Sequence, residues 1–479
     1  MTKTQYDVDI CIIGAGSGGL SVASGAAQLG RSVVLFEAEE MGGDCLNYGC
    51  VPSKALIAAG KHAHAFSTGS EFGVKPSKPE INFTTVKKHI QGVIDHIAPV
   101  DSQERFEGLG CTVIRERARF KDATTVESDT TEVKAKRFVI ATGSRASAPP
   151  IPGLSDVPYL TNETIFSVKT QPKKLLIIGA GPIGLELGQS FLRLGSKVAI
   201  VDISAPLGRS EPEHASFLVE ALREEGIEFH TPAKTKKIRK TKTGVAIDFE
   251  DGTSLTGSHL LVAAGRAPAI KDLNLEAAGI DYDRGGVLVS DALRSSNKRV
   301  YVAGDAAKGM GGLTHAAGFH AGQLIRNFYF SPPYMGDMLS SAKTDRMPAA
   351  IYTAPELASI GLTEAAAKEA GHNVRCVSWD FEENDRAIAE RSDKGHVKIV
   401  ATTKGKILGA SIVADGAGEL LHMISIAMTN KVKISGLAQI ISPYPTRSEA
   451  VKRAASSWYT DALFSDKTRK IAGFLTKFQ

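Results

Sequence analysis

The fold is decided by one stretch, Val8-Asp9-Ile10-Cys11-Ile12-Ile13-Gly14-Ala15-Gly16-Ser17-Gly18-Gly19, in which a short apolar run ends at a glycine-rich turn. A helical pattern then continues to Leu29, and a second apolar run ends at Glu37. Strand, glycine turn, helix, strand and acid in this order form a dinucleotide-binding unit. The glycines let the backbone approach a pyrophosphate at the helix N-terminus, and the acid takes ribose hydroxyls. We therefore predict that the dinucleotide contacts are Gly14, Gly16, Gly19 and Glu37.

The same pattern recurs 165 positions later in the chain. An apolar run from Leu175 to Ile178 leads into Gly179-Ala180-Gly181-Pro182-Ile183-Gly184, and a second run ends at Asp202. Two such units imply two bound nucleotides and an α/β fold with two Rossmann-like domains. The contacts expected in the second unit are Gly179, Gly181, Gly184 and Asp202.

The acid of the second unit indicates which nucleotide it binds. A carboxylate at this position accepts hydrogen bonds from the ribose hydroxyls of NAD and repels the 2′-phosphate of NADP. The three residues after Asp202 include no base, although Arg209 follows a little later. The sequence therefore favours NAD over NADP, and Glu37 suits the adenosine ribose of a second nucleotide.

Two cysteines stand five positions apart in Gly42-Gly43-Asp44-Cys45-Leu46-Asn47-Tyr48-Gly49-Cys50-Val51-Pro52-Ser53-Lys54. On a regular helix they would differ by about 140° in direction and about 7.5 Å in rise, which suits a disulfide poorly. A bonded pair needs a broken helix, and we expect Gly49 and Pro52 to supply the break. Two separate thiols, or half of a zinc site, are the alternatives.

Size and composition restrict the remaining possibilities. A chain of 479 residues with 43% hydrophobic residues and 47 glycines fits a large α/β protein of two to four domains. The net charge of +5, with no basic block, gives no argument for nucleic acid binding. Five cysteines are sparse for a chain of this length, which favours a reducing compartment. The sequence contains no run of 18 apolar residues that would indicate a membrane helix. We expect a cytoplasmic protein.

The cysteine stretch resembles the redox-active segment of the class I pyridine nucleotide-disulfide oxidoreductases, a family of flavoproteins that includes lipoamide dehydrogenase, glutathione reductase and mercuric reductase. The resemblance covers the whole chain, with the motifs in the expected order. It implies FAD in the first nucleotide unit, NAD(P)H in the second and a homodimer with a C-terminal α+β dimerisation domain. The expected domains are 1–152 with 281–345 for FAD, 153–280 for NAD(P) and 346–479 for dimerisation.

Further segments match motifs of the family. Arg137 to Gly143 and Leu260 to Gly265 are apolar runs that end in small-residue turns, and they resemble the crossings between the two nucleotide-binding domains. Val300-Tyr301-Val302-Ala303-Gly304-Asp305 resembles the second FAD-contacting motif. The resemblance therefore adds Thr142, Gly143 and Asp305 to the FAD contacts, and Gly265 to the NAD contacts.

The resemblance also assigns roles at the cysteine pair. Electrons pass from NADH through FAD to a Cys45–Cys50 disulfide, with Cys50 against the flavin and Cys45 exchanging with substrate. A nearby cation lowers a thiol pKa, and the family pattern places Lys54 at the flavin, paired with Glu186. The resemblance implies a small-molecule or protein disulfide as the substrate.

The C-terminal motif departs from the family pattern. Lipoamide dehydrogenase and glutathione reductase carry His-Pro-Thr and then a glutamate, and this histidine is an acid-base catalyst from the other subunit. Here Tyr444 replaces the histidine, and Glu449 is retained. A phenol titrates near 10, so Tyr444 donates a proton at neutral pH but is a poor base. His315, His320 and His422 are candidates for a substitute base.

Three functions remain open from the sequence. The first is an NADH-dependent FAD disulfide reductase most like lipoamide dehydrogenase. The second is an NADH:acceptor oxidoreductase of quinones or metal ions, similar to mercuric reductases, although these add a C-terminal cysteine pair and this chain has no cysteine after Cys376. The third is a docking subunit of a larger complex, which has no need of two nucleotide motifs and a cysteine pair.

Overall fold

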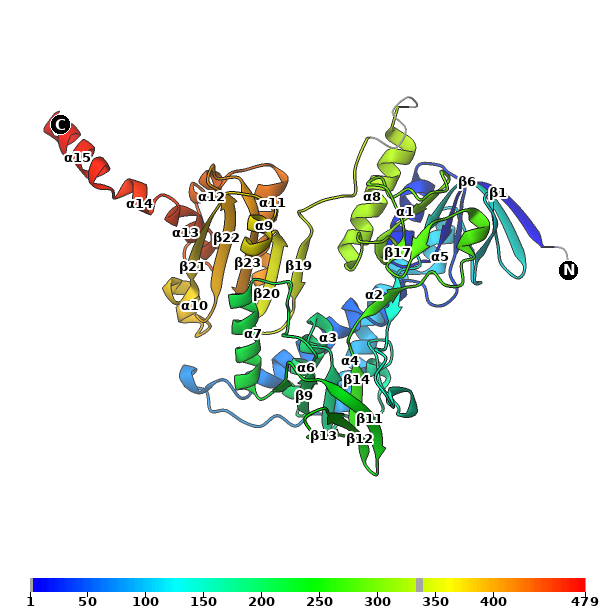
Figure 1. The fold of residues 1–479 in the computed structure, drawn as a ribbon, viewed down its shortest axis with the longest axis horizontal. Helices are drawn as coiled ribbons and strands as arrows, with labels where there is room; N and C mark the ends of the chain where they lie inside the picture. Colours follow the sequence, from blue (N-terminus) through cyan, green and yellow to red (C-terminus); the bar gives the residue numbers. More distant parts are fainter. Residues whose placement is uncertain (1–2, 333–338, 479) are drawn as a thin grey trace. The chain divides into compact units, whose positions relative to one another are not determined.

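The structure, a computed structural model, describes residues 3–332 and 339–478 and divides into two compact units (Figure 1). The first unit comprises the described residues up to 67 together with 77–203 and 232–344. The second comprises 68–76, 204–231 and the described residues from 345 onward.

The larger sheet of the first unit is built around β1, which lies between two parallel neighbours, β2 and β6. Its central strands are buried on both faces, as expected for a parallel sheet covered by helices. The strands follow the order β3-β2-β1-β6-β5-β4, and β18 also pairs with β6. Their bounds are β1 Thr4–Ile13, β2 Val33–Phe36, β3 Cys111–Ile114, β4 Arg119–Asp122, β5 Thr125–Glu127, β6 Thr131–Ile140 and β18 Val300–Val302.

Two helices pack together against this sheet, α1 (Ser17–Gln28) and α8 (Thr314–Phe330). Gly25 of α1 lies so close to Ile325 of α8 that an added Cβ would stand 2.9 Å from it. The remaining helices before the second nucleotide unit are α2 Gly43–Asn47, α3 Cys50–Ala65, α4 Phe83–Ile97 and α5 Gln103–Gly108.

The second nucleotide unit repeats this architecture on a smaller scale. Strand β8 lies between the parallel strands β9 and β14, and α6 follows β8 directly. An antiparallel sheet β11-β12-β13 and the short pairs β7-β15 and β16-β17 complete the first unit. The bounds are β7 Ser144–Ala146, β8 Lys174–Ile178, α6 Pro182–Arg193, β9 Lys197–Val201, β11 Thr235–Thr241, β12 Gly244–Phe249, β13 Ser254–Gly257, β14 His259–Val262, β15 Arg266–Pro268, β16 Tyr282–Asp283 and β17 Gly286–Val287.

The two nucleotide units match residue for residue. Ile12 is paired with Leu35 in the first unit, and Ile177 is paired with Ile200 in the second, so the shift of 165 positions holds in the strand register. The backbone N–H of Ala15 donates to Glu37 at 2.7 Å, and that of Ala180 donates to Asp202 at 2.8 Å. The prediction of an α/β fold with two Rossmann-like units is confirmed.

The second compact unit, which contains the C-terminal part of the chain, is built on the antiparallel sheet β19-β20-β23-β22-β21 (Figure 1). Helices α11 and α13 cover its core, and helix α7 packs on strands β20 and β23. The bounds are α7 Pro212–Glu225, β10 Glu228–His230, β19 Pro348–Ile351, β20 Glu356–Gly361, α9 Glu364–Glu369, β21 Val374–Asp380, α10 Asp385–Ala389, β22 His396–Thr402, β23 Ile407–Ala414, α11 Ala417–Thr429, α12 Ile434–Ala438, α13 Glu449–Ser457, α14 Thr460–Leu463 and α15 Asp466–Leu475.

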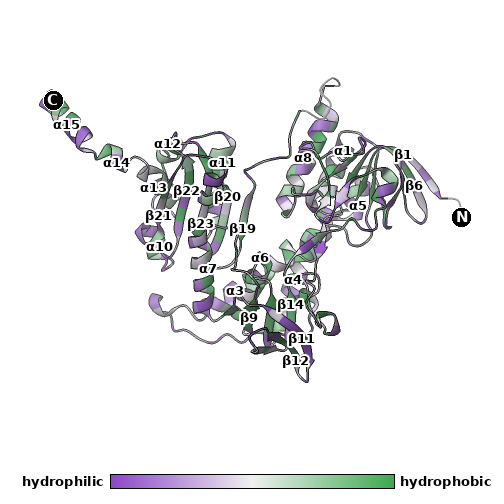
Figure 2. Ribbon diagram, viewed as in Figure 1, coloured by the Kyte–Doolittle hydropathy of each residue, from purple (hydrophilic) through white to green (hydrophobic). Residues whose placement is uncertain are grey.

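The hydropathy of the chain follows this division into core and surface. Hydrophobic residues follow the sheet strands, whereas α15 shows both kinds of residue and buries none (Figure 2). In the described part of the chain no helix is long and apolar enough to cross a membrane. The domain boundaries at 152, 280 and 345 stay a prediction; the compact units place residues 204–231, including α7, with the C-terminal sheet.

Candidate active site

The two cysteines flank a break between two helices. Cys45 lies in the short helix α2, and Cys50 is the first residue of α3. Tyr48 and Gly49 form the break, as predicted for Gly49. The prediction that Pro52 helps to break the helix is wrong. Pro52 is the third residue of α3, where its missing N–H and fixed φ fit a first helical turn.

Glycines bring the cysteine segment close to the first nucleotide turn. Gly42 and Gly43 have φ values of 87° and 60°, which other residues rarely adopt. A Cβ on Gly43 would stand 2.8 Å from the Cα of Gly16, and the Gly42 N–H donates to the Ala15 carbonyl at 2.9 Å. The cysteine segment therefore lies directly beside the turn expected to bind the pyrophosphate.

Both cysteines are thiols in this structure, and they form a hydrogen bond with each other. The hydrogen bond from Cys45 is the main reason that the pKa of Cys50 falls to about 6, and the Thr314 hydroxyl and the Lys54 charge lower it further. The Thr314 Oγ1 atom lies 3.3 Å from Cys50 Sγ. The same hydrogen bond, together with burial, raises the pKa of Cys45 above its usual range. Within the pair, the thiolate is therefore favoured at Cys50 and the protonated thiol at Cys45.

Lys54 is paired with Glu186, as the resemblance implies. The distance from Lys54 Nζ to Glu186 Oε2 is 2.8 Å, and the Glu186 side chain on α6 is only 7% exposed. Helix α3 lies close to α6 at Gly60, where an added Cβ would stand 3.3 Å from the backbone of Ser190. The pair holds a cation four residues after Cys50. The catalytic role of both residues stays a prediction.

The first nucleotide unit fits FAD on its backbone geometry. Gly14 has a φ of 104°, and a Cβ on Gly19 would stand 1.8 Å from the Gly14 carbonyl oxygen, so the turn accepts no larger residue at either position. Among the described residues, the buried Thr142 Oγ1 has no hydrogen-bond partner. Thr142 follows β6 at the carboxyl edge of the sheet, where a nucleotide binds in such folds. An unpaired hydroxyl at this edge is what a cofactor contact requires.

Asp305 stands just after β18 at the same edge. Its Oδ2 atom accepts a hydrogen bond from the Ser144 hydroxyl at 2.6 Å, and its Oδ1 atom accepts one from the Gly312 N–H at 2.7 Å. Gly143, directly before Ser144, has a φ of 67° and open space around its Cα. Thr142, Gly143 and Asp305 therefore lie at one edge of the sheet, as the motif order suggests.

The second nucleotide turn repeats the first. Gly179 has a φ of 114°, and a Cβ on Gly184 would stand 2.0 Å from the Gly179 carbonyl oxygen. No atom lies within 4 Å of where a Cβ on Gly181 or Gly265 would stand, which leaves room for a ligand. The residues present therefore fit a second dinucleotide at the start of α6.

Tyr444 and Glu449 belong to the second compact unit, and their assignment to the active site stays a prediction. The Tyr444 side chain is 71% exposed, and its hydroxyl donates to Asp385 Oδ2 at 2.7 Å. This hydrogen bond raises the pKa of Tyr444, so the phenol keeps its proton at neutral pH. Glu449 begins α13 and is paired with Arg453 at 3.1 Å.

The histidine candidates for a substitute base differ in their surroundings. His320 is buried, its Nδ1 atom accepts the Gly304 N–H at 3.1 Å, and burial lowers its pKa. It therefore has a structural role in holding the turn before Asp305. His422 of α11 is exposed beside Glu419 in the second compact unit, and His315 follows Thr314 in α8.

Thr314 is a site residue that the sequence analysis missed. It is the first residue of α8, and a helix N-terminus stabilises a thiolate. The glycine-rich segment before α8 is a sequence signal for the start of a helix. It does not indicate that this helix start contacts Cys50, which is 264 positions away. Only the folded chain shows this contact.

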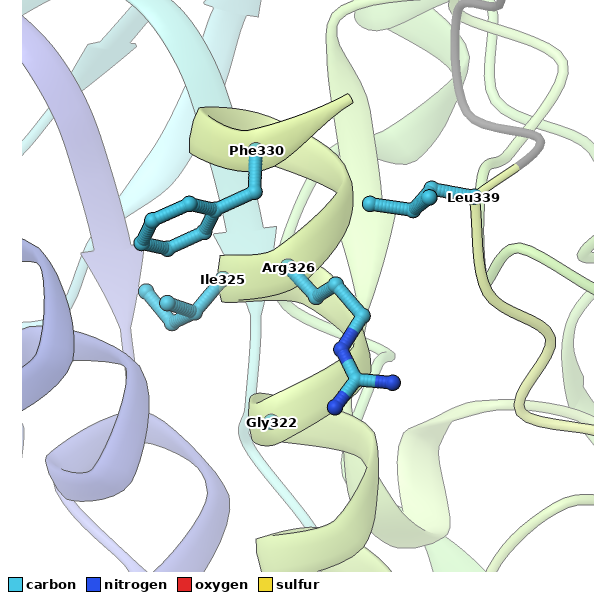
Figure 3. A pocket seen from close by; sticks show the side chains of 5 residues that line it. All are labelled: Gly322, Ile325, Arg326, Phe330 and Leu339. Atoms are coloured by element: carbon cyan, nitrogen blue, oxygen red, sulfur yellow. The ribbon is translucent and has the colours of Figure 1, made fainter. Parts of the chain in front are cut away.

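A pocket of about 460 Å³ on α8 contains none of the predicted site residues. Figure 3 shows Ile325 and Phe330 side by side on α8, with Leu339 opposite. In residues 3–332 and 339–478, no group of three or more histidine, cysteine or carboxylate side chains is arranged to hold a metal ion.

Comparison with known proteins agrees with this geometry. A family profile described as pyridine nucleotide-disulphide oxidoreductase matches residues 8–321, and the profile of the corresponding dimerisation domain matches residues 347–455. A mercuric reductase from Streptomyces lividans is 34% identical in an alignment 474 positions long, which covers 96% of this chain and 98% of that protein. A dihydrolipoyl dehydrogenase from Thermus scotoductus is 32% identical in an alignment 479 positions long, which covers 95% of this chain and 98% of that protein.

A solved structure shows the same fold over most of the chain. The HOCl-induced flavoprotein disulfide reductase RclA from Escherichia coli has a TM-score of 0.83 and 25% sequence identity, covering 94% of this chain and 99% of that chain. The chain belongs to the pyridine nucleotide-disulphide oxidoreductase family, the flavoprotein enzymes that use FAD and NAD(P)H.

Proposed function

We propose that this enzyme takes electrons from NADH and delivers them through FAD and the Cys45–Cys50 pair to a disulfide substrate. The balanced reaction is NADH, one proton and a disulfide giving NAD⁺ and two thiols. When bound, FAD accepts the hydride equivalent and supplies an electron pair to the sulfurs. The observation that carries the proposal is the geometry of the pair: Cys45 and Cys50 flank the break between α2 and α3, and the Thr314 hydroxyl at the start of α8 lies 3.3 Å from Cys50 Sγ.

The different states of the two thiols suit different tasks. Cys45 is the exchanging thiol: its sulfur attacks the substrate disulfide, forms a mixed disulfide and releases the first thiolate, which takes up a proton. The Cys50 thiolate then attacks the Cys45 sulfur, forms the Cys45–Cys50 disulfide and releases the second thiolate. A thiolate near its pKa is available for this step at neutral pH.

Proton transfer is the limiting feature of this proposal. Cys45 holds its proton, so its attack needs a base, and a phenol with a raised pKa is not one at neutral pH. We therefore propose slower turnover of disulfides than a histidine at position 444 would give. Tyr444 still donates protons to departing thiolates. Glu449 is proposed to orient this motif.

Asp202 supports NADH as the reductant. Its carboxylate lies at the end of β9 and accepts the Ala180 N–H at the start of the glycine turn. A 2′-phosphate at this position would meet a negative charge. We also propose that the enzyme is a homodimer without membrane partners. A cytoplasmic location is proposed because disulfides in reducing compartments are usually transient and catalytic.

Metal-ion reduction is the second candidate because mercuric reductases are among the similar proteins. The test is a screen of NADH oxidation by the holoenzyme with lipoamide, oxidised glutathione, coenzyme A disulfide, quinones and mercuric ion. We expect a disulfide to be reduced with the highest kcat/KM, and NADPH to be a poorer donor than NADH. A preference for mercuric ion or quinones that survives in Cys45→Ser would replace the proposal by the second candidate.

A further inference from the structure

The carboxylate next to the exchanging cysteine is held by side chains from distant parts of the chain. Asp44 directly precedes Cys45 in α2. Its Oδ2 atom lies 3.2 Å from Nη2 of Arg266, the first residue of β15. Its Oδ1 atom accepts a hydrogen bond from the Asn162 amide at 3.1 Å. Both oxygens of Asp44 therefore have partners, and the cysteine segment is tied to the strand that leaves the second nucleotide unit.

Arg266 is itself fixed by a strand of the first nucleotide unit. Its Nε atom donates to the Ser144 hydroxyl oxygen at 2.8 Å, and its Nη2 atom donates to the Ser144 carbonyl at 2.7 Å. The Ser144 hydroxyl in turn donates to Asp305 at 2.6 Å. A continuous chain of polar contacts therefore runs from Asp305 through Ser144 and Arg266 to Asp44.

These polar contacts affect the electrostatics of Cys50, because they end at Asp44. The groups that face Cys50 are Cys45, Thr314, Lys54 with its partner Glu186, and Asp44. The negative charge of Asp44 opposes a thiolate at Cys50, in contrast to Cys45, Thr314 and Lys54. A guanidinium is always charged and binds a carboxylate in a fixed geometry, so Arg266 offsets the Asp44 charge at every relevant pH. Without Arg266, Asp44 would keep the neutral Asn162 amide as a partner, and its charge would act more strongly on Cys50.

We propose that Arg266 is a positioning residue for the redox pair: through Asp44 it fixes the segment that carries Cys45 and shields Cys50 from the Asp44 charge. The inference rests on the proposed function, because it concerns the thiolate that faces the flavin. It links the strand crossing between the two nucleotide units to the reactivity of the cysteines. Ser144 and Asn162 are the side chains that hold this pair in place.

The test is a pH titration of the long-wavelength charge-transfer absorbance of the reduced holoenzyme, which reports the Cys50 thiolate. We expect Asp44→Asn to lower the apparent pKa by about half a unit and Arg266→Gln to raise it by a similar amount, the size of an interaction between partly exposed charges. In the Asp44→Asn background, Arg266→Gln should have a smaller effect, since most of its action passes through Asp44. Arg266→Lys, which keeps the charge, should restore part of the wild-type titration.

Arg145→Gln is the matched control. Arg145 lies in β7, paired with β15, and its guanidinium contacts Glu39 at 2.5 Å instead of Asp44. This variant should titrate like the wild type. The inference is overturned if Asp44→Asn leaves the apparent pKa unchanged, or if Arg266→Gln causes the same shift in both backgrounds. If Arg266→Gln fails to fold, the apparent pKa of Asp44→Asn is the deciding measurement, and an unchanged value overturns the inference. Loss of the charge-transfer band in the wild type would instead contradict the proposed function.

Discussion

The hydroxyl of Thr314 lies 3.3 Å from the sulfur of Cys50, which makes a single side chain a test of how the thiolate is stabilised. A hydroxyl that donates to an anion stabilises it more than it stabilises the neutral thiol. Thr314→Val should therefore raise the pKa of Cys50 from about 6, by roughly half a unit or more, while Thr314→Ser keeps it. The pH dependence of Cys50 alkylation in the reduced protein, followed by mass spectrometry, measures this. Equal pKa values in the valine and serine variants would remove Thr314 from the site.

Tyr444 provides a second test at the residue scale. General acid-base catalysis typically contributes about 10²–10⁴-fold, so we expect Tyr444→His to raise disulfide turnover by up to about 10²-fold near pH 7. Tyr444→Phe should lower turnover, because the proton donor is lost. Steady-state kcat with the best disulfide from the screen is the measurement. Unchanged kcat in both variants would mean that another residue transfers the proton.

Cys45, Cys50 and Lys54 stand in one short motif, which the sequence shows directly, and their catalytic roles stay predictions. The pairing of Lys54 with Glu186, 132 positions away, came from the family resemblance, and the structure places the two side chains 2.8 Å apart. Thr314 and Arg266 were not predicted, because their contacts with the cysteine segment join parts of the chain that are far apart in sequence. No periodicity or spacing encodes such contacts.

At the scale of elements, the glycine turns before α1 and α6 separate folding from binding. A Cβ on Gly19 would stand 1.8 Å from a carbonyl oxygen, whereas a Cβ on Gly16 would meet only the Gly43 Cα at 3.9 Å. Gly19→Ala should therefore destabilise the protein by about 1–3 kcal/mol or prevent folding. Gly16→Ala should fold but bind FAD more weakly, because its methyl group would point at the pyrophosphate site. Thermal unfolding and flavin content of the two purified variants test this; equal unfolding temperatures would contradict it.

A buried lysine joins helix α7 to the C-terminal sheet. Lys398 of β22 is 10% exposed and lies 3.1 Å from Glu211, 2.6 Å from Glu213 and 2.8 Å from Glu364. Lys398→Met leaves Glu211 and Glu213 without this cation and leaves Glu364 paired with Lys368, and breaking such a buried group costs about 3–5 kcal/mol. We expect the unfolding temperature to fall by roughly 5 °C or more.

The matched control for Lys398 is Lys394→Met. Lys394 is 76% exposed and makes an ion pair with Glu224 at 3.7 Å, so its loss should change stability by less than about 0.5 kcal/mol. Differential scanning calorimetry compares the two variants. Similar unfolding temperatures for both would show that the buried cluster does not stabilise the packing of α7.

The elements themselves were predictable to different degrees. The repeat at 165 positions correctly gave both nucleotide units, because their strands and glycine turns follow simple patterns. Pro52 was misread because a proline breaks a helix interior but suits a first turn. The association of α7 with the C-terminal sheet includes the contact of Lys398 with Glu211 and that of His214 with Ser411, and these join parts of the chain that are far apart in sequence.

At the scale of the whole molecule, the dimerisation domain profile at 347–455 supports a homodimer, and we propose that Tyr444 acts in the site of the partner subunit. If Tyr444 acts across subunits, a mixed dimer of Cys50→Ser and Tyr444→Phe chains contains one fully intact site. Such mixed dimers, purified with two different affinity tags, should recover about half of the wild-type turnover. Recovery no greater than the average of the two parent variants would place Tyr444 in its own subunit's site or outside it.

The account rests on electrons passing from NADH through FAD to a cysteine pair in which Cys50 faces the flavin. The most direct measurement is an anaerobic titration of the FAD-loaded protein with one equivalent of NADH, followed by its absorption spectrum. We predict that a long-wavelength charge-transfer band develops in the wild type on addition of NADH. In Cys45→Ser the band should be present before NADH is added, because a lone Cys50 thiolate then faces oxidised flavin, and in Cys50→Ser it should be absent before and after the addition. Absence of the band in the wild type, or its persistence in Cys50→Ser, would contradict the account.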